Sequence, residues 1–246
     1  MNLTYCGDTH ICGRRVNEDA LAMQQIADHL ALFVVADGLG GHTAGEVASR
    51  LAVAALVDTV QRTVPAYPSV FSVQMREVLH AGFLAAARSI GNDCSINVKH
   101  AGMATTLVAA LVNDALECVV AHVGDSRAYR AGEAFTQITK DHSYVQELFE
   151  RGLITWEELR LHPVRNIVTR VVSAVPVDPD FVEFTLGSGT LVFCTDGLTG
   201  ALSDAEIFSE IQGTDVPQIC RNLIERARAA AGDNTTVIVV RGLPGV

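Results

Sequence analysis

Five aspartates have the residue type and the local setting needed to bind a metal ion. Each lies at a strand edge beside glycine, asparagine or a polar turn, and they are Asp19, Asp37, Asp125, Asp196 and Asp233. Clustered carboxylates repel one another unless a cation holds them. Oxygen-only ligands suit hard ions such as magnesium or manganese, and no His/Cys set with zinc spacing competes. The alternative is that each Asp marks only a tight turn.

Apolar strands must deliver these aspartates to one place. Residues 30–36 form an apolar run that ends on Asp37 and several glycines, which predicts a strand covered on both faces. The long helix predicted over residues 69–90 is expected to end near Gly91-Asn92. The remaining strands are predicted over 1–12, 20–26, 105–112, 116–123, 181–186, 190–194 and 237–241, and the helices over 43–62, 69–90, 204–211 and 217–230.

The order of these elements indicates a single α+β domain. Strands and helices come in runs instead of strict alternation, which favours mostly antiparallel sheets with helices outside. The sequence has no internal repeat, low-complexity tract or obvious linker, so we expect one domain over residues 1–246. Residues 139–170 are polar, charged and helical, which is typical of an insertion.

Composition excludes several classes of protein. Hydrophobic residues make up 49% of the chain and charged residues 19%, which fits a packed globular fold. A net charge of −10 argues against nucleic acid and anionic membranes as partners, because both bind basic surfaces. No apolar run approaches membrane-spanning length, and the six cysteines form no Cys-x-x-Cys pair. We therefore expect a cytoplasmic protein with reduced thiols, and a monomer.

Short motifs in a fixed order extend this interpretation over nearly the whole chain. They are Arg14-x-x-Asn17-Glu18-Asp19 and the segments at residues 35–42, 102–106, 124–127, 195–197 and 233–236. Together they resemble the motifs of the metal-dependent protein phosphatase family, also called protein phosphatase 2C, in its compact bacterial form. The resemblance implies a four-layer α-β-β-α sandwich of two antiparallel sheets flanked by helix pairs, with a metal site at one edge of the sandwich.

The resemblance also implies a ligand set for two or three Mn²⁺ or Mg²⁺ ions. Asp37 is expected to bridge two ions, with Asp196 and Asp233 as ligands of the first and the Gly38 carbonyl as a ligand of the second. Asp125 is expected to hold a third ion together with Asp196. A structural turn is the alternative role for Asp125.

Other residues acquire supporting roles from the same resemblance. Glu18 and Asp19 are expected to be outer acids that hold metal-bound water. Arg14 matches the family's phosphate-binding arginine, whose planar guanidinium suits bidentate contact with phosphoryl oxygens. Arg15 is expected to face solvent.

Two segments differ from the family or leave a role open. Larger eukaryotic relatives carry a histidine two residues after the bridging acid, where this chain has Leu39. His42 is a candidate general acid instead, and a helix-entry histidine without a catalytic role is the alternative. A flap-like insertion is expected over about residues 139–173, where Arg165 and Arg170 either contact substrate or are merely solvated.

The sequence therefore predicts hydrolysis of phosphoserine and phosphothreonine in proteins by a metal-activated water, without a covalent phosphoenzyme. The expected partners are phosphorylated proteins and a bacterial Ser/Thr kinase that the enzyme opposes. A catalytically inactive relative is an alternative that the intact acids and Arg14 argue against. A calcium-binding protein is another, but no loop follows the D-x-D-x-D-G pattern, and the glycine-rich loop matches no nucleotide-binding motif.

Overall fold

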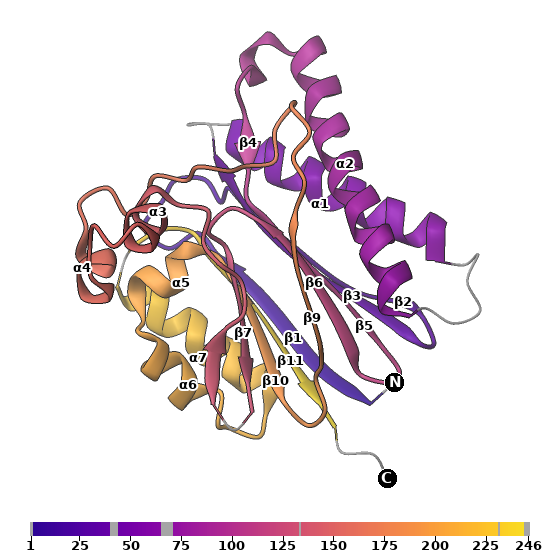
Figure 1. Ribbon diagram of the computed structural model, residues 1–246, viewed down its shortest axis with the longest axis vertical. Coiled ribbons are helices and arrows are strands. Elements are labelled where there is room, and N and C mark those ends of the chain that lie inside the picture. Colours follow the sequence, from indigo (N-terminus) through magenta and orange to yellow (C-terminus); the bar gives the residue numbers. More distant parts are fainter. Residues whose placement is uncertain (1, 40–43, 65–70, 133, 231, 244–246) are drawn as a thin grey trace.

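Two antiparallel sheets pack face to face in the computed structural model, which describes residues 2–39, 44–64, 71–132, 134–230 and 232–243 (Figure 1). One sheet, called the β1 sheet, has the spatial order β1 (Leu3–His10), β11 (Thr235–Gly242), β10 (Thr190–Cys194), β7 (Arg127–Ala131) and β8 (Phe135–Gln137). The other, called the β3 sheet, has the order β2 (Asp19–Ala27), β3 (Leu30–Leu39), β5 (Leu107–Asn113), β6 (Glu117–Val123) and β9 (Asp180–Thr185), with β4 (Ala104–Thr105) paired to β3.

Helices cover the outer face of each sheet. The β3 sheet is covered by α1 (Ala44–Thr63) and α2 (Ser72–Ile96), and the β1 sheet by α5 (Asp196–Ala201), α6 (Asp204–Glu210) and α7 (Val216–Ala229) (Figure 1). The predicted α+β sandwich of four layers is confirmed. On the β1 side, the expected helix pair is one long helix accompanied by two short ones.

The strand β3 shows why the sequence forms a sandwich. Its side chains alternate between two apolar cores, so that Leu32 and Val34 pack under α1 and α2 while Phe33 and Val35 face the β1 sheet. Both faces of the strand are therefore buried, which explains an apolar run without polar alternation. The Phe33 ring stacks on Phe193 of β10 with a centroid distance of 6.4 Å, which joins the sheets.

The predicted flap segment forms two short helices beside the β1 sheet. They are α3 (Tyr144–Glu150), whose first turn is capped by the Ser143 hydroxyl, and α4 (Trp156–Leu161), which begins with a Thr155 capping box. The two ends of the segment meet, because Ser143 and Val168 form a β-bridge. This closed base makes the insertion a compact excursion from the sandwich.

The predicted end of one helix was wrong. The helix α2 continues past Gly91-Asn92 to Ile96, and a short 3-10 turn at Val98–His100 follows it. At Gly91 an added Cβ would lie 3.6 Å from Ala174, which is ordinary van der Waals contact. This glycine is therefore a residue of the helix that packs against the segment around Ala174. A glycine next to an asparagine favours the end of a helix, but this helix continues through the pair to Ile96.

Candidate metal centre

The register of the sheets brings the predicted acids to one edge of the sandwich. Asp19 at the start of β2 lies directly opposite Asp37 of β3. In the β1 sheet, Cys194 at the end of β10 pairs with Val237 of β11, so the chain that continues to Asp196 lies close to Asp233. Acids that are far apart in sequence therefore meet through antiparallel pairing in two different sheets.

Asp19 is anchored by hydroxyl groups from the opposite sheet. Its Oδ2 accepts hydrogen bonds from the Thr195 hydroxyl at 2.9 Å and the Thr236 hydroxyl at 2.7 Å. Its Oδ1 is buried and has no hydrogen-bond partner among the described residues. One oxygen is thus fixed, while the other is left without a partner, which is costly for a buried carboxylate unless something outside the chain contacts it.

Asp37 is held through its backbone. Its N–H donates to the Thr106 hydroxyl at 2.9 Å, and its carbonyl accepts from the Thr105 hydroxyl and the Thr106 N–H, both at 2.8 Å. The Thr106 hydroxyl also lies 2.7 Å from the hydroxyl of Ser126. These contacts place Asp37 inside strand β3, which runs on to Leu39, and not at the strand end that the sequence suggested.

Asp196 and Asp233 complete the group. The charge of Asp196 raises the pKa of Asp37, so the two carboxyl groups lie close together, and the buried Oδ1 of Asp196 has no hydrogen-bond partner among the described residues. Asp233 forms an ion pair with Arg14. Asn234 fixes the loop around them, because its Oδ1 accepts the Glu18 N–H at 2.9 Å and its Nδ2 donates to the carbonyl of Val16 at 3.0 Å.

Gly38 lies where the chain from β3 passes close to the beginning of α1. Its N–H donates to the Glu18 carbonyl at 3.1 Å. An added Cβ at Gly38 would lie 2.1 Å from the Gly45 carbonyl oxygen, so no larger residue fits without moving the backbone. The close approach places the backbone of Gly38 and Glu18 beside Asp19 and Asp37.

Burial and mutual repulsion raise the pKa values of the acids. Burial, opposed in part by the two threonine hydroxyls and assisted by neighbouring aspartates, raises the pKa of Asp19 to about 7. Burial first, and then the charges of Asp19, Asp196, Asp125 and Asp233, raise the pKa of Asp37 well above its usual range. Burial and the charge of Asp233 raise the pKa of Asp196. Without a cation, the group resists carrying its full negative charge at neutral pH.

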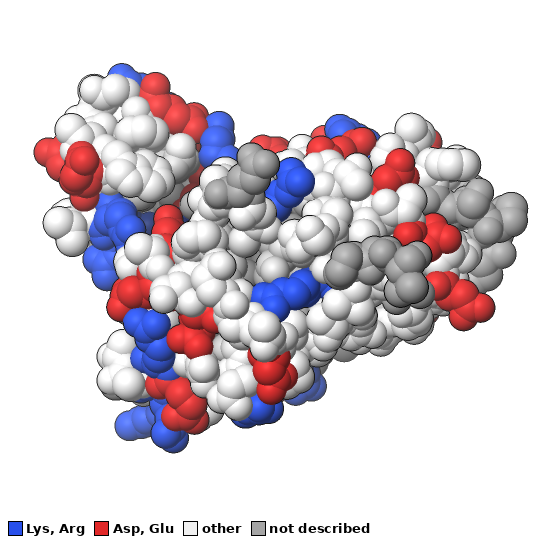
Figure 2. All heavy atoms as spheres, turned by 90° about the horizontal axis from the view of Figure 1, so that it is seen from below, with Lys and Arg blue, Asp and Glu red and all other residues white. Residues whose placement is uncertain are grey.

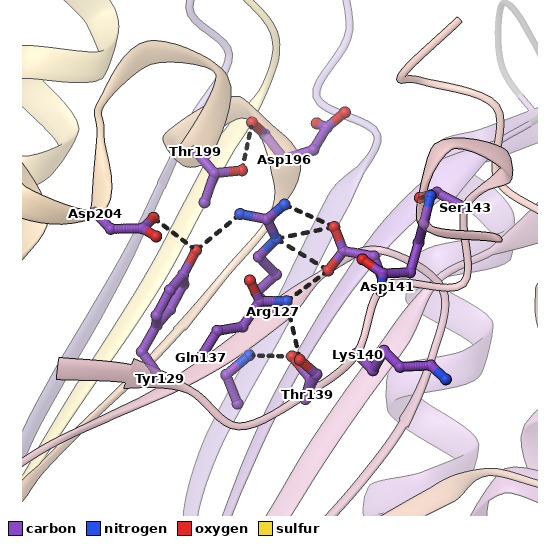
Figure 3. A network of polar contacts seen from close by, with 12 residues as sticks. Arg127, Tyr129, Gln137, Thr139, Lys140, Asp141, Ser143, Asp196, Thr199 and Asp204 are labelled. Atoms are coloured by element: carbon purple, nitrogen blue, oxygen red, sulfur yellow. Dashed lines mark hydrogen bonds and ion pairs between the residues drawn. The ribbon is translucent and has the colours of Figure 1, made fainter. Parts of the chain in front are cut away.

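Asp125 belongs to the same electrostatic group and approaches from β6. Burial, followed by the charge of Asp196, raises its pKa to about 7. The following residues lead into a buried polar network in which Arg127 binds Asp141 (Figure 3). Arg127 also donates to the Tyr129 hydroxyl at 2.9 Å, which in turn lies 3.3 Å from Asp204 at the start of α6.

A cavity of about 580 Å³ opens beside the acids. Its lining includes Asp125, Asp196 and Asp233, and the flap contributes Trp156 and Arg165. The acids and the flap therefore share one hollow. Arg160, Asn166, Ser143 and Leu159 also line it.

The structure thus brings together all the described acids that the sequence singled out, with Arg14 at the rim. His42, the candidate general acid, lies outside the described residues. Arg170 turns away from the cavity lining to bind Asp180 at 2.8 Å. The sequence analysis assigned no role to Thr106, Thr195 and Thr236, although all are buried and lie in the quoted motifs. Their burial could not be read from sequence, because it depends on strand register.

The donor set fits a hard divalent cation. All the candidate ligands are oxygens, two of the carboxylate oxygens are buried without a partner among the described residues, and the carboxylates raise one another's pKa. A bound cation would satisfy those oxygens and offset the repulsion. Oxygen-only coordination suits manganese or magnesium, as the sequence indicated.

Comparison with known proteins assigns the chain to a family. Residues 6–229 match the model of the protein phosphatase 2C family, and the chain belongs to this family. It is 38% identical over 213 residues to the serine/threonine protein phosphatase PstP of Mycobacterium tuberculosis, which covers 85% of this chain but only 40% of that protein. The chain therefore spans less than half the length of this relative.

Solved structures agree with this assignment. The crystal structure of the Mycobacterium tuberculosis serine/threonine phosphatase PstP/Ppp is 33% identical, covers 99% of both chains and has a TM-score of 0.88. A crystal structure of the catalytic domain of PstP in complex with two manganese ions is 32% identical, covers 97% of both chains and has a TM-score of 0.84. The family membership expected from the motifs is confirmed.

Proposed function

We propose that this chain hydrolyses phosphoserine and phosphothreonine in proteins and depends on Mn²⁺ or Mg²⁺. The observation that carries the proposal is the convergence of five aspartates from both sheets, with buried oxygens of Asp19 and Asp196 left without partners among the described residues. The similar proteins named serine/threonine phosphatases, one of them solved with two manganese ions, support the same conclusion.

The residues that would hold two ions are Asp37 as the bridging ligand, Asp196 and Asp233 on one ion, and the Gly38 carbonyl on the other. The effect of the Asp196 charge on the pKa of Asp37 supports a shared ion, because only closely spaced carboxyl groups can contact one cation. Asp125 would hold a third ion with Asp196, and the effect of the Asp196 charge on the pKa of Asp125 supports that assignment.

Bound divalent cations would lower the pKa of water and orient it for in-line attack on phosphorus, so no covalent phosphoenzyme is required. Asp19 and Glu18 would accept hydrogen bonds from the water molecules that surround the ions. The two threonine hydroxyls that fix Asp19 Oδ2 keep its Oδ1 directed to this task. The positioning is rigid because Asp19 is only 7% exposed.

Arg14 would bind the phosphoryl group. Its guanidinium is exposed and pairs with Asp233 at the cavity edge, so it is close enough to neutralise an anion beside the acids. Two oxygens of a phosphoryl group can accept a pair of parallel N–H bonds from a guanidinium, as the two oxygens of a carboxylate do. His42 remains our candidate for the proton donor to the leaving alcohol.

Phosphorylated proteins are the substrates that the surroundings favour. The cavity of about 580 Å³ is lined by Arg160 and Arg165 of the flap as well as by the acids, so it offers positive charge to a phosphorylated segment. Figure 2 shows acidic and basic side chains interspersed on one face instead of a continuous basic patch, which does not favour nucleic acid. A Ser/Thr kinase is the activity that such an enzyme would oppose.

We infer that residues 139–173 act as a flap on one catalytic domain.

We also place this activity in the cytoplasm. The six cysteines are all free thiols, as is typical of a reducing compartment. None of the described helices is long and apolar enough to cross a membrane.

Hydrolysis of a small aryl phosphate and of a phosphothreonine peptide, with and without manganese, tests the proposal. Wild type should be active only with metal. Asp37→Asn and Asp196→Asn should abolish both activities and keep a cooperative melting transition, because they remove proposed ligands and leave the core unchanged. Asp114→Asn, at an exposed turn, is the control. Near-normal turnover of either site variant at saturating manganese would contradict the proposal.

A further inference from the structure

The residues on both sides of Asp125 are hydrogen-bonded to two consecutive residues at the entrance to the flap. Arg127 binds Asp141, and Gly124 binds His142. On one side, the Arg127 Nε donates to both carboxylate oxygens of Asp141 at 3.0 Å, and its Nη2 donates to Oδ2 at 2.6 Å (Figure 3). The side chains of Arg127 and Asp141 are 20% and 11% exposed, so this ion pair is largely shielded from water. It fixes the chain just after Asp125.

On the other side, His142 binds Gly124 at two points. The His142 N–H donates to the Gly124 carbonyl at 2.9 Å, and the Gly124 N–H donates to the His142 Nδ1 at 3.0 Å. Gly124 has a φ of +109° and is packed so closely that an added Cβ would lie 2.6 Å from the Thr106 side chain. The backbone before Asp125 thus has little freedom to move.

The contact with Gly124 determines the tautomer of His142. A backbone N–H can only donate, so Nδ1 must carry the lone pair and the proton of the neutral ring is on Nε2. Nε2 lies 3.2 Å from Asp180 Oδ2, which accepts this proton. Burial lowers the pKa of His142, which favours the neutral form. The His142 ring therefore donates from Nε2 to the Asp180 carboxylate and accepts at Nδ1 from the Gly124 N–H.

The same residues could suggest a metal site, since ligand atoms of His122, His142 and Asp180 lie within 4.8 Å of one another. Two observations favour a hydrogen-bonded support instead, which we call the His142 brace: the contacts of His142 with Gly124 and Asp180. The Nε2 of His142 carries a proton in the required tautomer. The guanidinium of Arg170 already supplies a cation, because it donates to Asp180 Oδ1 at 2.8 Å. Its Nη1 also lies 2.7 Å from His142 Nε2, but both groups are donors in this tautomer, so this contact is not a hydrogen bond.

We propose that His142 is a positioning residue for the phosphatase reaction: its Nδ1 fixes the backbone that places the Asp125 carboxylate, and its main chain joins this loop to the flap. The His142 carbonyl accepts the Thr169 N–H at 2.8 Å, so the entrance and exit of the flap are tied to the same residue. From Ser126 the connection continues through the Thr106 hydroxyl to the Asp37 backbone. The effect on catalysis rests on the proposed function, whereas the brace itself does not.

Asparagine and glutamine at position 142 separate the two ends of the ring. The Oδ1 of asparagine can replace Nδ1 as the acceptor for Gly124, while the amide of glutamine reaches the position of Nε2 and leaves Gly124 without an acceptor. We expect His142→Gln and His142→Ala to lower kcat/KM by about ten- to a hundred-fold, the usual cost of losing such a support. His142→Asn should keep most of the activity.

His80→Gln is the matched control, because the His80 Nε2 also pairs with an aspartate, Asp178, at 2.9 Å but on the surface. It should leave kcat/KM unchanged. Melting curves with and without manganese show whether each variant is folded at the assay temperature. A purely structural histidine would affect the melting temperature and would not separate the asparagine and glutamine variants in kcat/KM at a temperature where both are folded.

Amide hydrogen exchange of Gly124, measured by NMR in metal-free protein, tests the brace without any assay of activity. Protection of this amide should be retained in His142→Asn and lost in His142→Gln. Equal protection in the two variants, equal kcat/KM, or wild-type kcat/KM in His142→Ala would overturn the inference. If the wild type proves inactive on phosphoproteins, the proposed function fails, and the exchange experiment still decides whether the brace exists.

Discussion

Asp19 illustrates how single residues prepare this site for a cation. Two hydroxyl groups from the other sheet hold one carboxylate oxygen, and the second oxygen faces the remaining acids without a partner among the described residues. A buried carboxylate with one oxygen left over is unfavourable in a protein that never binds metal. A bound cation would stabilise this carboxylate by contacting its unpaired oxygen.

Arg14→Ala should raise KM for phosphopeptide more than it lowers kcat. In the proposed assignment the guanidinium would contact the phosphoryl group in both ground and transition states, so its loss would remove uniform binding. A charge-assisted hydrogen bond of about 1.5–3 kcal/mol corresponds to roughly ten-fold or more in KM. Arg15→Ala, a neighbouring exposed arginine, is the control and should change little. Steady-state kinetics showing equal effects at both positions would place the phosphate elsewhere.

Asp125→Ala should retain two tightly bound metal ions and hydrolyse phosphopeptide at least about ten-fold more slowly. In the proposed assignment Asp37, Asp196 and Asp233 would form the two-ion site without Asp125. Calorimetric titration with manganese and kinetics on the same variant measure both quantities. Since burial raises the pKa of Asp125 to about 7, the variant should not be less stable than wild type without metal. Unchanged turnover together with a lower melting temperature would make Asp125 a turn residue.

At the scale of secondary structure, the beginning of α5 explains how Asp196 is aimed. The strand β10 ends at Cys194, and the helix starts at Asp196, where Gly197 lies against the loop of Asn234. An added Cβ at Gly197 would lie 2.0 Å from the Asn234 carbonyl oxygen. This close approach allows the segments that carry Asp196 and Asp233 to stand side by side.

Gly197→Ala should therefore destabilise the protein by about 1–3 kcal/mol, the usual cost of overpacking, and weaken manganese binding. Gly200→Ala is a matched control in the same helix, because an added Cβ there meets nothing within 4 Å. The control should be as stable as wild type or slightly more stable, since alanine favours helix. Urea unfolding and manganese titration of both variants check the prediction. Equal stability of the two variants would show that the helix can shift without cost.

The sequence predicted most elements but not how they end. Apolar runs such as 30–36 identified strands correctly, because a strand buried on both faces needs no polar residue. The Thr-Asp-Gly at 195–197 indicated an acid after a strand and gave no sign of the helix α5 that starts there. The extension of α2 past Gly91 depends on contacts with a distant segment. Element ends are set by tertiary packing, which local pattern does not record.

The candidate site follows the same division. The acids could be identified because each carries its own motif. The threonines that anchor Asp19, the pair of Arg127 and Asp141, and the His142 brace all join segments distant in sequence. Only strand register brings such partners together, so no local signal marks them.

At the scale of the whole molecule, the proposed ligands are divided between the two sheets. Asp37 belongs to the β3 sheet, whereas Asp196 and Asp233 flank strands of the β1 sheet. Repulsion among them pushes the two sheets apart at this edge, and a bound cation would hold them together. Stability should therefore depend jointly on metal and pH.

Metal-free protein should lose stability as pH rises from about 4 to 7. Asp19 has a folded pKa of about 7 against its ordinary value of 3.8, so the folded state holds its proton more tightly and is penalised once that proton leaves. Asp19→Asn removes the contribution of Asp19 to this dependence and should be more stable than wild type at pH 8, on the order of a few kcal/mol. The difference between the two proteins should shrink toward pH 5.

Urea unfolding of both proteins with EDTA, at several pH values, measures this difference. The comparison with the variant is necessary because burial lowers the pKa values of His122 and His142, which act in the opposite direction as pH falls below about 6.5. Manganese should stabilise wild type more at pH 8 than at pH 6, because protons compete for the ligands. A wild-type protein that becomes relatively more stable with rising pH would contradict the electrostatic account.

The pairing of β1 with β11 also determines where a tag or a surface can be attached to the molecule. Near the ends of the described chain, the Leu243 N–H donates to the Asn2 carbonyl at 2.8 Å, while His10 at the other end of the pair lies opposite Thr235 beside the acids (Figure 1). Eight paired residues span about 25 Å. A tag, a resin or a fusion partner joined next to Asn2 or Leu243 would therefore be attached at the end of the β1–β11 pair that lies away from the acids.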